Sequence, residues 1–125
     1  MEKTLTIDGR EVRFKSTAAT ALRYKAQFGR DFFADLLKMV PIIKIAQNKE
    51  LEDMTYDQLQ QLDFEIFYHI IWVLAKTADK SIPEPIEWLD TFEEFPLQEI
   101  LPELQDLIAA SFQGKKNSNQ MTPSQ

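Results

Sequence analysis

The chain has 125 residues, of which 44% are hydrophobic, and its formal net charge is −6. This length and composition are typical of a single globular domain built around one hydrophobic core. The chain contains no cysteine, which excludes disulfides, thiolate catalysis and cysteine-based zinc sites, and its acidic charge argues against a general nucleic-acid binder. The N-terminal residues lack the apolar segment of a signal peptide, so we expect a cytoplasmic protein.

The charge is distributed unevenly along the chain. Residues 1–30 carry seven basic and three acidic side chains, a net +4, whereas residues 31–112 carry five basic and seventeen acidic ones, a net −12. Such a separation favours head-to-tail association between copies or attraction of charged partners. We therefore take Arg10 and Arg13 in the basic part as candidate partner-binding residues. The alternative is a solvated surface of uneven composition.

Residues 3–15 are predicted to form a β-hairpin. Asp8-Gly9 is typical of a two-residue type I′ turn, in which both residues need a positive φ. The resulting register places four apolar side chains on one face: Leu5, Ile7, Val12 and Phe14. A lone hairpin is marginally stable in water, so this face is expected to pack on helices. Alternatively, the open edges of the hairpin pair with another subunit.

A first helix is expected to begin at a cap formed by Ser16 or Thr17 and to continue to about Phe28. Gly29 is predicted to adopt the left-handed conformation that ends a helix. The side chains expected to face the core are Ala21, Leu22 and Phe28.

Asp31 is predicted to cap a second helix. Its expected apolar side chains are Phe32, Phe33, Leu36, Leu37 and Val40. Pro41 lacks an amide hydrogen and should kink or end this helix. The polar segment 47–54 that follows is predicted to be a loop.

Residues 64–78, FEIFYHIIWVLAKTA, are predicted to form the central helix of the fold. Their apolar side chains cover most of the helix circumference, which is typical of a helix that has neighbours on several sides. A narrow polar strip remains, made of Glu65, His69, Lys76 and Asp79, with Trp72 at its edge. The run is far shorter than the ~20 residues that cross a membrane, so we expect a buried core helix and no membrane partner.

The C-terminal part is predicted to be helical with interruptions. A capping box at 55–58 should lead through Leu59 and Leu62 into the central helix, with a bend near Asp63. Residues 86–92 should form a short turn or helix that presents Trp88, Leu89 and Phe92. The last helix is expected to run to Phe112, either from Pro96 or, after a break, from Pro102. Residues 113–125 show no apolar periodicity and are predicted to be a disordered tail.

The sequence thus predicts an α+β, mostly helical fold with one globular domain over residues 1–112. Its hairpin at 3–15 should pack on a bundle of about four to six helices within 17–112.

No motif for catalysis, phosphate binding or cofactor binding is present, so we expect neither an enzyme nor a cofactor. His69 and Glu65 lie one helical turn apart, but a metal site needs further ligands. Pairing on the helix surface, or simple exposure, is the simpler interpretation. If the first two helices formed a helix-turn-helix, Asp31 and Asp35 would lie where bases or phosphates must be met, which argues against DNA binding.

The hairpin followed by ATALRYKAQFGRDFFADLLKM resembles the tail assembly chaperones of long-tailed bacteriophages and of prophages of Gram-positive bacteria. The strongest similarity runs from Leu22-Arg23-Tyr24 through the segment FGRDF at 28–32. The aromatic-rich helix, Trp88-Leu89 and the acidic C-terminal half are also similar. The resemblance covers roughly residues 1–112.

The resemblance implies a non-enzymatic role in the host cytoplasm. Such a chaperone binds the tape measure protein, helps to recruit tail tube subunits, and leaves before the virion matures. It marks four further candidate partner-binding residues: Arg23, Tyr24, Phe28 and Arg30. The alternative for these four is helix packing beside a glycine cap. Two other functions stay open: a small helix-turn-helix-like DNA-binding regulator, and a structural subunit that remains in the tail.

Overall fold

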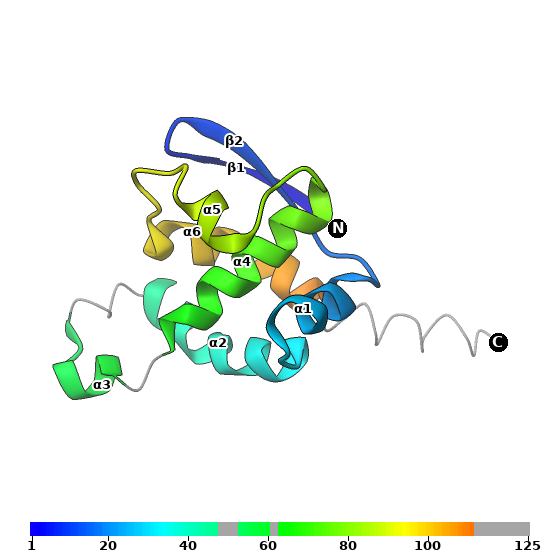
Figure 1. Cartoon of the computed structure of the whole chain (residues 1–125). Coiled ribbons are helices and arrows are strands. Elements are labelled where there is room, and N and C mark those ends of the chain that lie inside the picture. Colours follow the sequence, from blue (N-terminus) through cyan, green and yellow to red (C-terminus); the bar gives the residue numbers. More distant parts are fainter. Residues whose placement is uncertain (48–52, 61–62, 112–125) are drawn as a thin grey trace.

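The computed structural model describes residues 1–47, 53–60 and 63–111 (Figure 1). Its elements are β1 (Glu2–Ile7), β2 (Arg10–Lys15), α1 (Thr20–Phe28), α2 (Phe32–Gln47), α3 (Tyr56–Gln60), α4 (Phe64–Ala78), α5 (Pro85–Leu89) and α6 (Leu97–Glu103). The chain turns at Leu104 and is helical again over residues 105–111. The predicted α+β, mostly helical class is confirmed.

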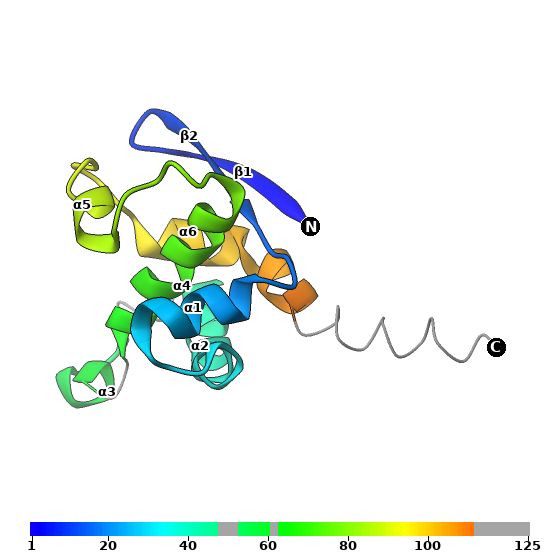
Figure 2. The ribbon, with the colours of Figure 1, turned by 45° about the vertical axis from the view of Figure 1, so that its right-hand side comes forward.

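Helix α4 lies in the middle of the molecule. Figures 1 and 2 show the hairpin on one side of it and α1 and α2 on the other. The bounds of α4 are those predicted, and nine of its residues are buried: Ile66, Phe67, Ile70, Ile71, Trp72, Val73, Leu74, Ala75 and Thr77. Apolar side chains on most of its circumference therefore contact different elements at once.

Trp72 is more deeply buried than its predicted place at the edge of the polar strip suggests, with 2% of its surface exposed. Its indole N–H donates to the backbone carbonyl of Pro83, at 2.9 Å. The segment after α4 therefore folds back against the helix and supplies the acceptor that a buried indole needs.

The hairpin forms with the predicted turn and register. Asp8 and Gly9 have φ of 53° and 76°, and Ile7 pairs with Arg10, as a two-residue turn requires. On its apolar face Leu5 is partly buried, and the other three side chains are buried: Ile7, Val12 and Phe14. This face packs on the core that α4 organises.

The start of α1 differs from the prediction. The helix begins at Thr20, and the Thr17 hydroxyl accepts the amide of Ala19 (3.2 Å) in a turn before the helix instead of capping it. Leu22, predicted to face the core, is 74% exposed. Thr20 and Tyr24 are the buried residues of α1, and Leu22, halfway between them, projects from the opposite side of the helix.

Helix α2 is capped as predicted, because the Asp31 carboxylate accepts the amide of Ala34 at 2.8 Å. Two of the apolar side chains expected on this helix are exposed: Leu37 (64%) and Val40 (36%). Among residues 32–41, the buried apolar side chains are Phe32, Leu36 and Met39, which follow each other at helical spacing on the face toward the core. Of the two effects predicted for Pro41, an end of the helix is wrong, since the helix continues to Gln47, and a kink stays a prediction.

The C-terminal helices follow the predicted order with shifted ends. Helix α5 ends at Leu89, three residues before the predicted limit, and α6 begins directly after Pro96, the first of the two predicted starts. Pro102 lies inside α6 and does not mark its start. The tail predicted at 113–125 and most of the loop predicted at 47–54 lie outside the described residues. No helix in the described part of the chain has the length and apolarity to cross a membrane.

Candidate functional site

Three residues that carry the resemblance meet where α1 turns into α2. We call this region the α1–α2 corner; it consists of Tyr24, Phe28, Arg30 and Asp35. Gly29 forms the turn with a φ of 70°, and its amide donates to the carbonyl of Lys25 at 2.8 Å. The predicted left-handed glycine is confirmed, and the tight turn brings the two helices together.

A buried carboxylate holds the α1–α2 corner together. Asp35 is 2% exposed, and its Oδ2 accepts the Tyr24 hydroxyl at 2.7 Å and Arg30 Nε at 2.8 Å. Arg30 Nη2 donates to the other oxygen, Oδ1, at 2.9 Å. Three donors from two segments therefore satisfy a charge that would be costly to bury alone.

The same contacts set the protonation of the α1–α2 corner. Burial tends to raise the pKa of Asp35, but the hydrogen bonds from Arg30 and Tyr24 outweigh it and hold the pKa below its usual value. Burial and the hydrogen bond to Asp35 both raise the pKa of Tyr24. At neutral pH the corner therefore contains an ionised Asp35, a cationic Arg30 and a neutral Tyr24.

An aromatic cluster connects the α1–α2 corner to α4. The Tyr24 ring lies 4.9 Å from that of Phe28, and Phe28 stacks on His69 with ring centroids 3.9 Å apart and an interplanar angle of 13°. His69 is half-buried, and its buried Nδ1 has no hydrogen-bond partner among the described residues. Burial lowers the pKa of His69, against the nearby charge of Glu65. The ring therefore packs in its neutral form.

A metal site at His69 and Glu65 would need further ligands close by. No group of three or more histidine or acidic residues in the described ranges could hold a metal ion. The stacking on Phe28 shows what the side chain does in the fold: it fills the space between α1 and α4.

Arg10 and Arg13 lie on the hairpin, far from the α1–α2 corner in the fold. The Arg10 guanidinium lies 3.8 Å from the centre of the Phe92 ring and donates to Thr91 Oγ1 at 2.8 Å. Arg13 donates to the carbonyl of Ala78 at 3.1 Å and pairs with Glu2 at 3.3 Å. Both side chains are exposed, yet both tie the hairpin to the helical body. That they bind a partner stays a prediction.

Arg23 is the fourth residue marked by the resemblance, and its side chain is half-buried. Its Nε is buried and meets no hydrogen-bond partner in the part of the chain that the structure describes. Tyr24 has no exposed surface, so any effect of Tyr24 on a partner would act through the shape of the α1–α2 corner.

Sequence reasoning missed two features of this region. It did not identify Asp35 as the acceptor for Tyr24 and Arg30, because the contact depends on how two helices are placed. It also did not separate the exposed Leu37 and Val40 from the buried apolar side chains of α2. Together with the partly buried Phe33 they follow an i, i+4, i+7 pattern, and we call these three residues the outer stripe of α2. One signal in the sequence was available: the apolar residues of α2 are spaced so that they lie on two faces of the helix, and a core can cover only one of them.

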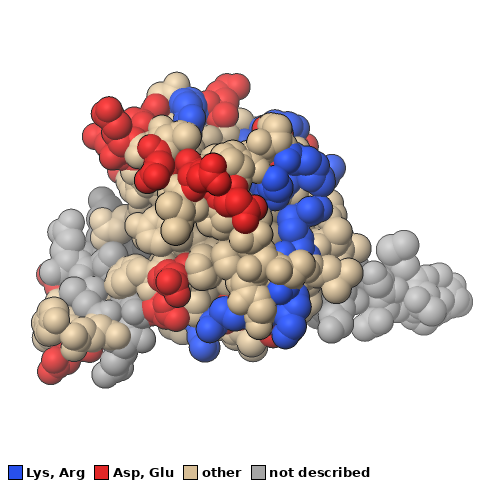
Figure 3. Space-filling view, viewed as in Figure 1, with Lys and Arg blue, Asp and Glu red and all other residues tan. Residues whose placement is uncertain are grey.

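The uneven charge of the sequence is also visible on the surface. In the face shown in Figure 3, basic side chains gather on one side and most acidic ones on the other. Comparisons with models of protein families, with curated proteins and with solved structures found no match. We therefore base the functional proposal on the resemblance and on the geometry above.

Proposed function

We propose that this chain is a phage tail assembly chaperone that binds the tape measure protein and helps to recruit tail tube subunits. It would act in the host cytoplasm through binding alone and leave before the virion matures. The observation that carries the proposal is that the segment of strongest resemblance, residues 22–32, folds into the α1–α2 corner, which is flanked by exposed apolar side chains.

Exposed apolar side chains beside the α1–α2 corner are the surface that a chaperone of a long, poorly soluble partner would use. Leu22 is 74% exposed on α1, and Leu37 is 64% exposed on α2. Single exposed leucines are common, but on the outer stripe of α2 the exposed Leu37 and Val40 lie on the same side of the helix as the partly buried Phe33. The hydrogen bonds of Asp35 hold α1 and α2 at a fixed angle and so keep this surface in one shape.

Co-expression with a tape measure fragment from the same genome tests the proposal. We expect the fragment to stay soluble and to co-purify with the wild-type chain. Leu37→Gln with Val40→Gln should abolish co-purification, because glutamine removes the apolar contact but keeps helix propensity. Ile86→Gln is the control, since Ile86 is also an exposed apolar residue (76%) but lies on α5.

Two results would count against this function. One is failure of the wild-type chain to retain the fragment; the other is equal retention by the α2 and α5 variants. Mass spectrometry of purified virions separates a chaperone, which should be absent, from a structural tail subunit, which should be present.

We also propose that copies associate head to tail, the basic N-terminal part of one copy against the acidic part of the next. A heterologous contact of this kind can repeat along an elongated partner. Sedimentation velocity should show oligomers at 0.1 M salt that dissociate at 1 M, where the Debye length falls from ~10 Å to ~3 Å. Lys15→Glu with Lys25→Glu is a cleaner test than reversing Arg10 and Arg13, whose side chains hold the hairpin in place. A monomer at every salt concentration would refute the association.

A further inference from the structure

Strand β1 has an open edge. Within the described residues the sheet consists of β1 and β2 alone. The two-residue turn closes on the hydrogen-bonded pair Ile7 and Arg10, and pairs then alternate along the hairpin, so the backbone amides and carbonyls of Thr4 and Thr6 point away from β2. In the described ranges no other segment bonds to these groups. They are free to pair with another strand.

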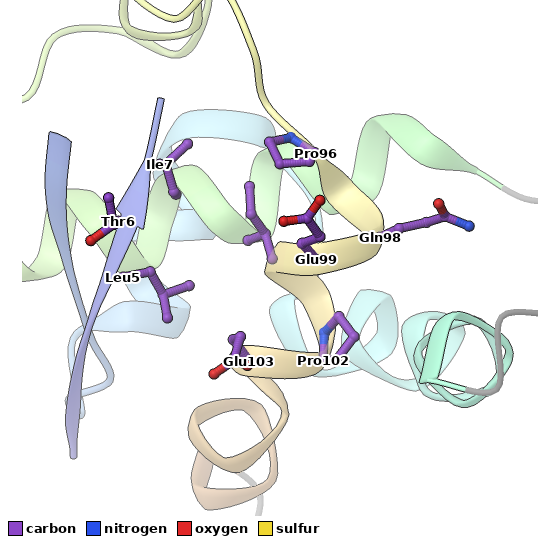
Figure 4. A pocket seen from close by; sticks show the side chains of 9 residues that line it. Leu5, Thr6, Ile7, Pro96, Gln98, Glu99, Pro102 and Glu103 are labelled. Atoms are coloured by element: carbon purple, nitrogen blue, oxygen red, sulfur yellow. The ribbon is translucent and has the colours of Figure 1, made fainter. Parts of the chain in front are cut away.

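A groove of about 470 Å³ runs beside this edge, between β1 and α6. Figure 4 shows Leu5 and Ile7 pointing from β1 toward α6, while the carboxylates of Glu99 and Glu103 point back toward the strand. Ile100 adds to the apolar lining. The groove therefore combines an apolar lining, carboxylates and a row of unpaired backbone groups.

The acidic charge of the groove favours a basic segment as its occupant. Among the described residues that line it, both charged ones, Glu99 and Glu103, are acidic. Glu103 pairs with Lys3 at 3.3 Å, but its side chain stays 59% exposed, and Glu99 is exposed as well. An incoming segment with Lys or Arg meets complementary charge here, and one with Asp or Glu meets repulsion.

The other edge of the hairpin is different. Arg10 and Arg13 reach from β2 to Thr91 and to the carbonyl of Ala78. Charged side chains that cross a strand edge in this way hinder the approach of a further strand. The hairpin is thus open to strand addition at β1.

We propose that the β1 edge and the β1–α6 groove bind an extended, basic segment of a partner protein by strand addition. The backbone of the segment pairs with Thr4 and Thr6, and alternate side chains enter the groove, where an apolar one contacts the partly buried Leu5 and flanking Lys or Arg side chains reach Glu99 and Glu103. The inference stands apart from the identity of the partner proposed above.

A second copy of the chain fits this site less well. Pairing two β1 edges around a two-fold axis brings the Glu99 and Glu103 side chains of both copies to the same rim, and like charges opposed across a sheet are destabilising. Pairing β1 with the β2 edge of another copy is hindered by Arg10 and Arg13. The geometry therefore favours a different chain over self-pairing.

A labelled heptapeptide tests the proposal on the full-length protein by fluorescence anisotropy. The probe is Thr-Lys-Thr-Val-Thr-Lys-Thr, whose Lys and Val side chains fall on one face of a strand, and the control has Glu in place of both Lys. We expect the Lys peptide to bind at least about tenfold more tightly, as expected for two charge pairs. Equal binding of the two peptides, or none, would overturn the proposal.

Two pairs of protein variants locate the site. Thr6→Pro removes the outward amide of β1 without removing a bond between the strands, and Glu11→Pro makes the same change at the paired residue on the β2 edge. We expect Thr6→Pro to weaken binding about fivefold to tenfold, as expected for a lost hydrogen bond, and Glu11→Pro to have little effect. Equal effects of both would place the peptide elsewhere.

The second pair does not depend on the hairpin tolerating proline. Glu99→Gln with Glu103→Gln should remove most of the preference for the Lys peptide, whereas the exposed control Glu87→Gln on α5 should keep it. If the preference survives the double change, the charge complementarity proposed here is wrong. If the peptides do not bind and Thr6→Pro instead abolishes self-association, the edge belongs to a second copy and the proposal is overturned.

Discussion

Tyr24→Phe tests whether the buried hydrogen bond at the α1–α2 corner stabilises the fold. The substitution removes the 2.7 Å hydrogen bond to Asp35 and leaves the ring contacts with Phe28 and Phe32 in place. A hydrogen bond to a charged group contributes ~1.5–3 kcal/mol. Asp35 keeps both bonds from Arg30, so no unpaired charge remains, and we expect the lower part of that range, about 1.5–2 kcal/mol. For a domain of this size the corresponding fall in Tm is about 5–10 °C.

Tyr56→Phe is the matched control, measured beside it by urea and thermal unfolding. Tyr56 is 72% exposed, and its hydroxyl accepts Gln60 Nε2 at 2.9 Å at the surface. Its loss should change the free energy of unfolding by less than about 0.5 kcal/mol. A double-mutant cycle of Tyr24→Phe with Asp35→Asn should show a coupling of about 1 kcal/mol. If Tyr24→Phe behaves like Tyr56→Phe, the corner does not stabilise the fold as argued.

Four further predictions concern the core, the pH dependence and the hairpin turn. Ile71→Ala should lower the free energy of unfolding by ~2–5 kcal/mol, because Ile71 is fully buried on α4; an unchanged urea midpoint would contradict the central position of α4. The pKa of His69 lies below its usual 6.5 in the folded state, so protonation favours the unfolded chain and stability should fall as pH drops below about 6.5; His69→Phe should flatten the thermal-melt profile between pH 7.5 and 5.5. The pKa of Asp35 is also lowered, from its usual 3.8, so the stability that its ionised form contributes is present above pH 3.8 and is lost as the pH falls below it. Asp35→Asn should therefore make the stability of the fold less sensitive to acid in this pH range. Gly9→Ala should cost ~1–2 kcal/mol, because Gly9 has a φ of 76°, which strains a residue with a Cβ. No described atom lies within 4 Å of the added Cβ, so no steric clash adds to this cost. Asparagine tolerates a positive φ, so Gly9→Asn should cost less in the same melts.

Features set by a few neighbouring residues were predictable from the sequence. Asp8-Gly9 specifies a turn whose two residues need positive φ, and that turn fixes the register of the whole hairpin. Gly29 and Asp31 act within one turn of the helices that they end and begin. The bounds of α4 followed from its apolar run and the polar residues at its ends. In each case the preference acts over a short stretch of backbone and does not depend on distant contacts.

Burial on α1 and α2 was less predictable. Both faces of α2 carry apolar side chains, so periodicity alone does not reveal that Leu36 is buried and Leu37 is exposed. Leu22 is likewise exposed, because Tyr24 occupies the face of α1 that meets the core. Which face is covered depends on the neighbours of a helix, and those are decided by the packing of the whole chain.

The candidate sites likewise have some features that follow from neighbouring residues and others that depend on the packing of the whole chain. The sequence by itself determined that Tyr24 and Arg30 flank a glycine turn, since this follows from their spacing along the chain. Only the tertiary structure decided that both bind Asp35, that Arg10 covers the β2 side of the hairpin, and that the β1 edge stays open beside Glu99. Hydrogen bonds and charge pairs form between groups a few ångströms apart in space, and in these cases the residues involved come from different elements, so their meeting depends on how those elements pack.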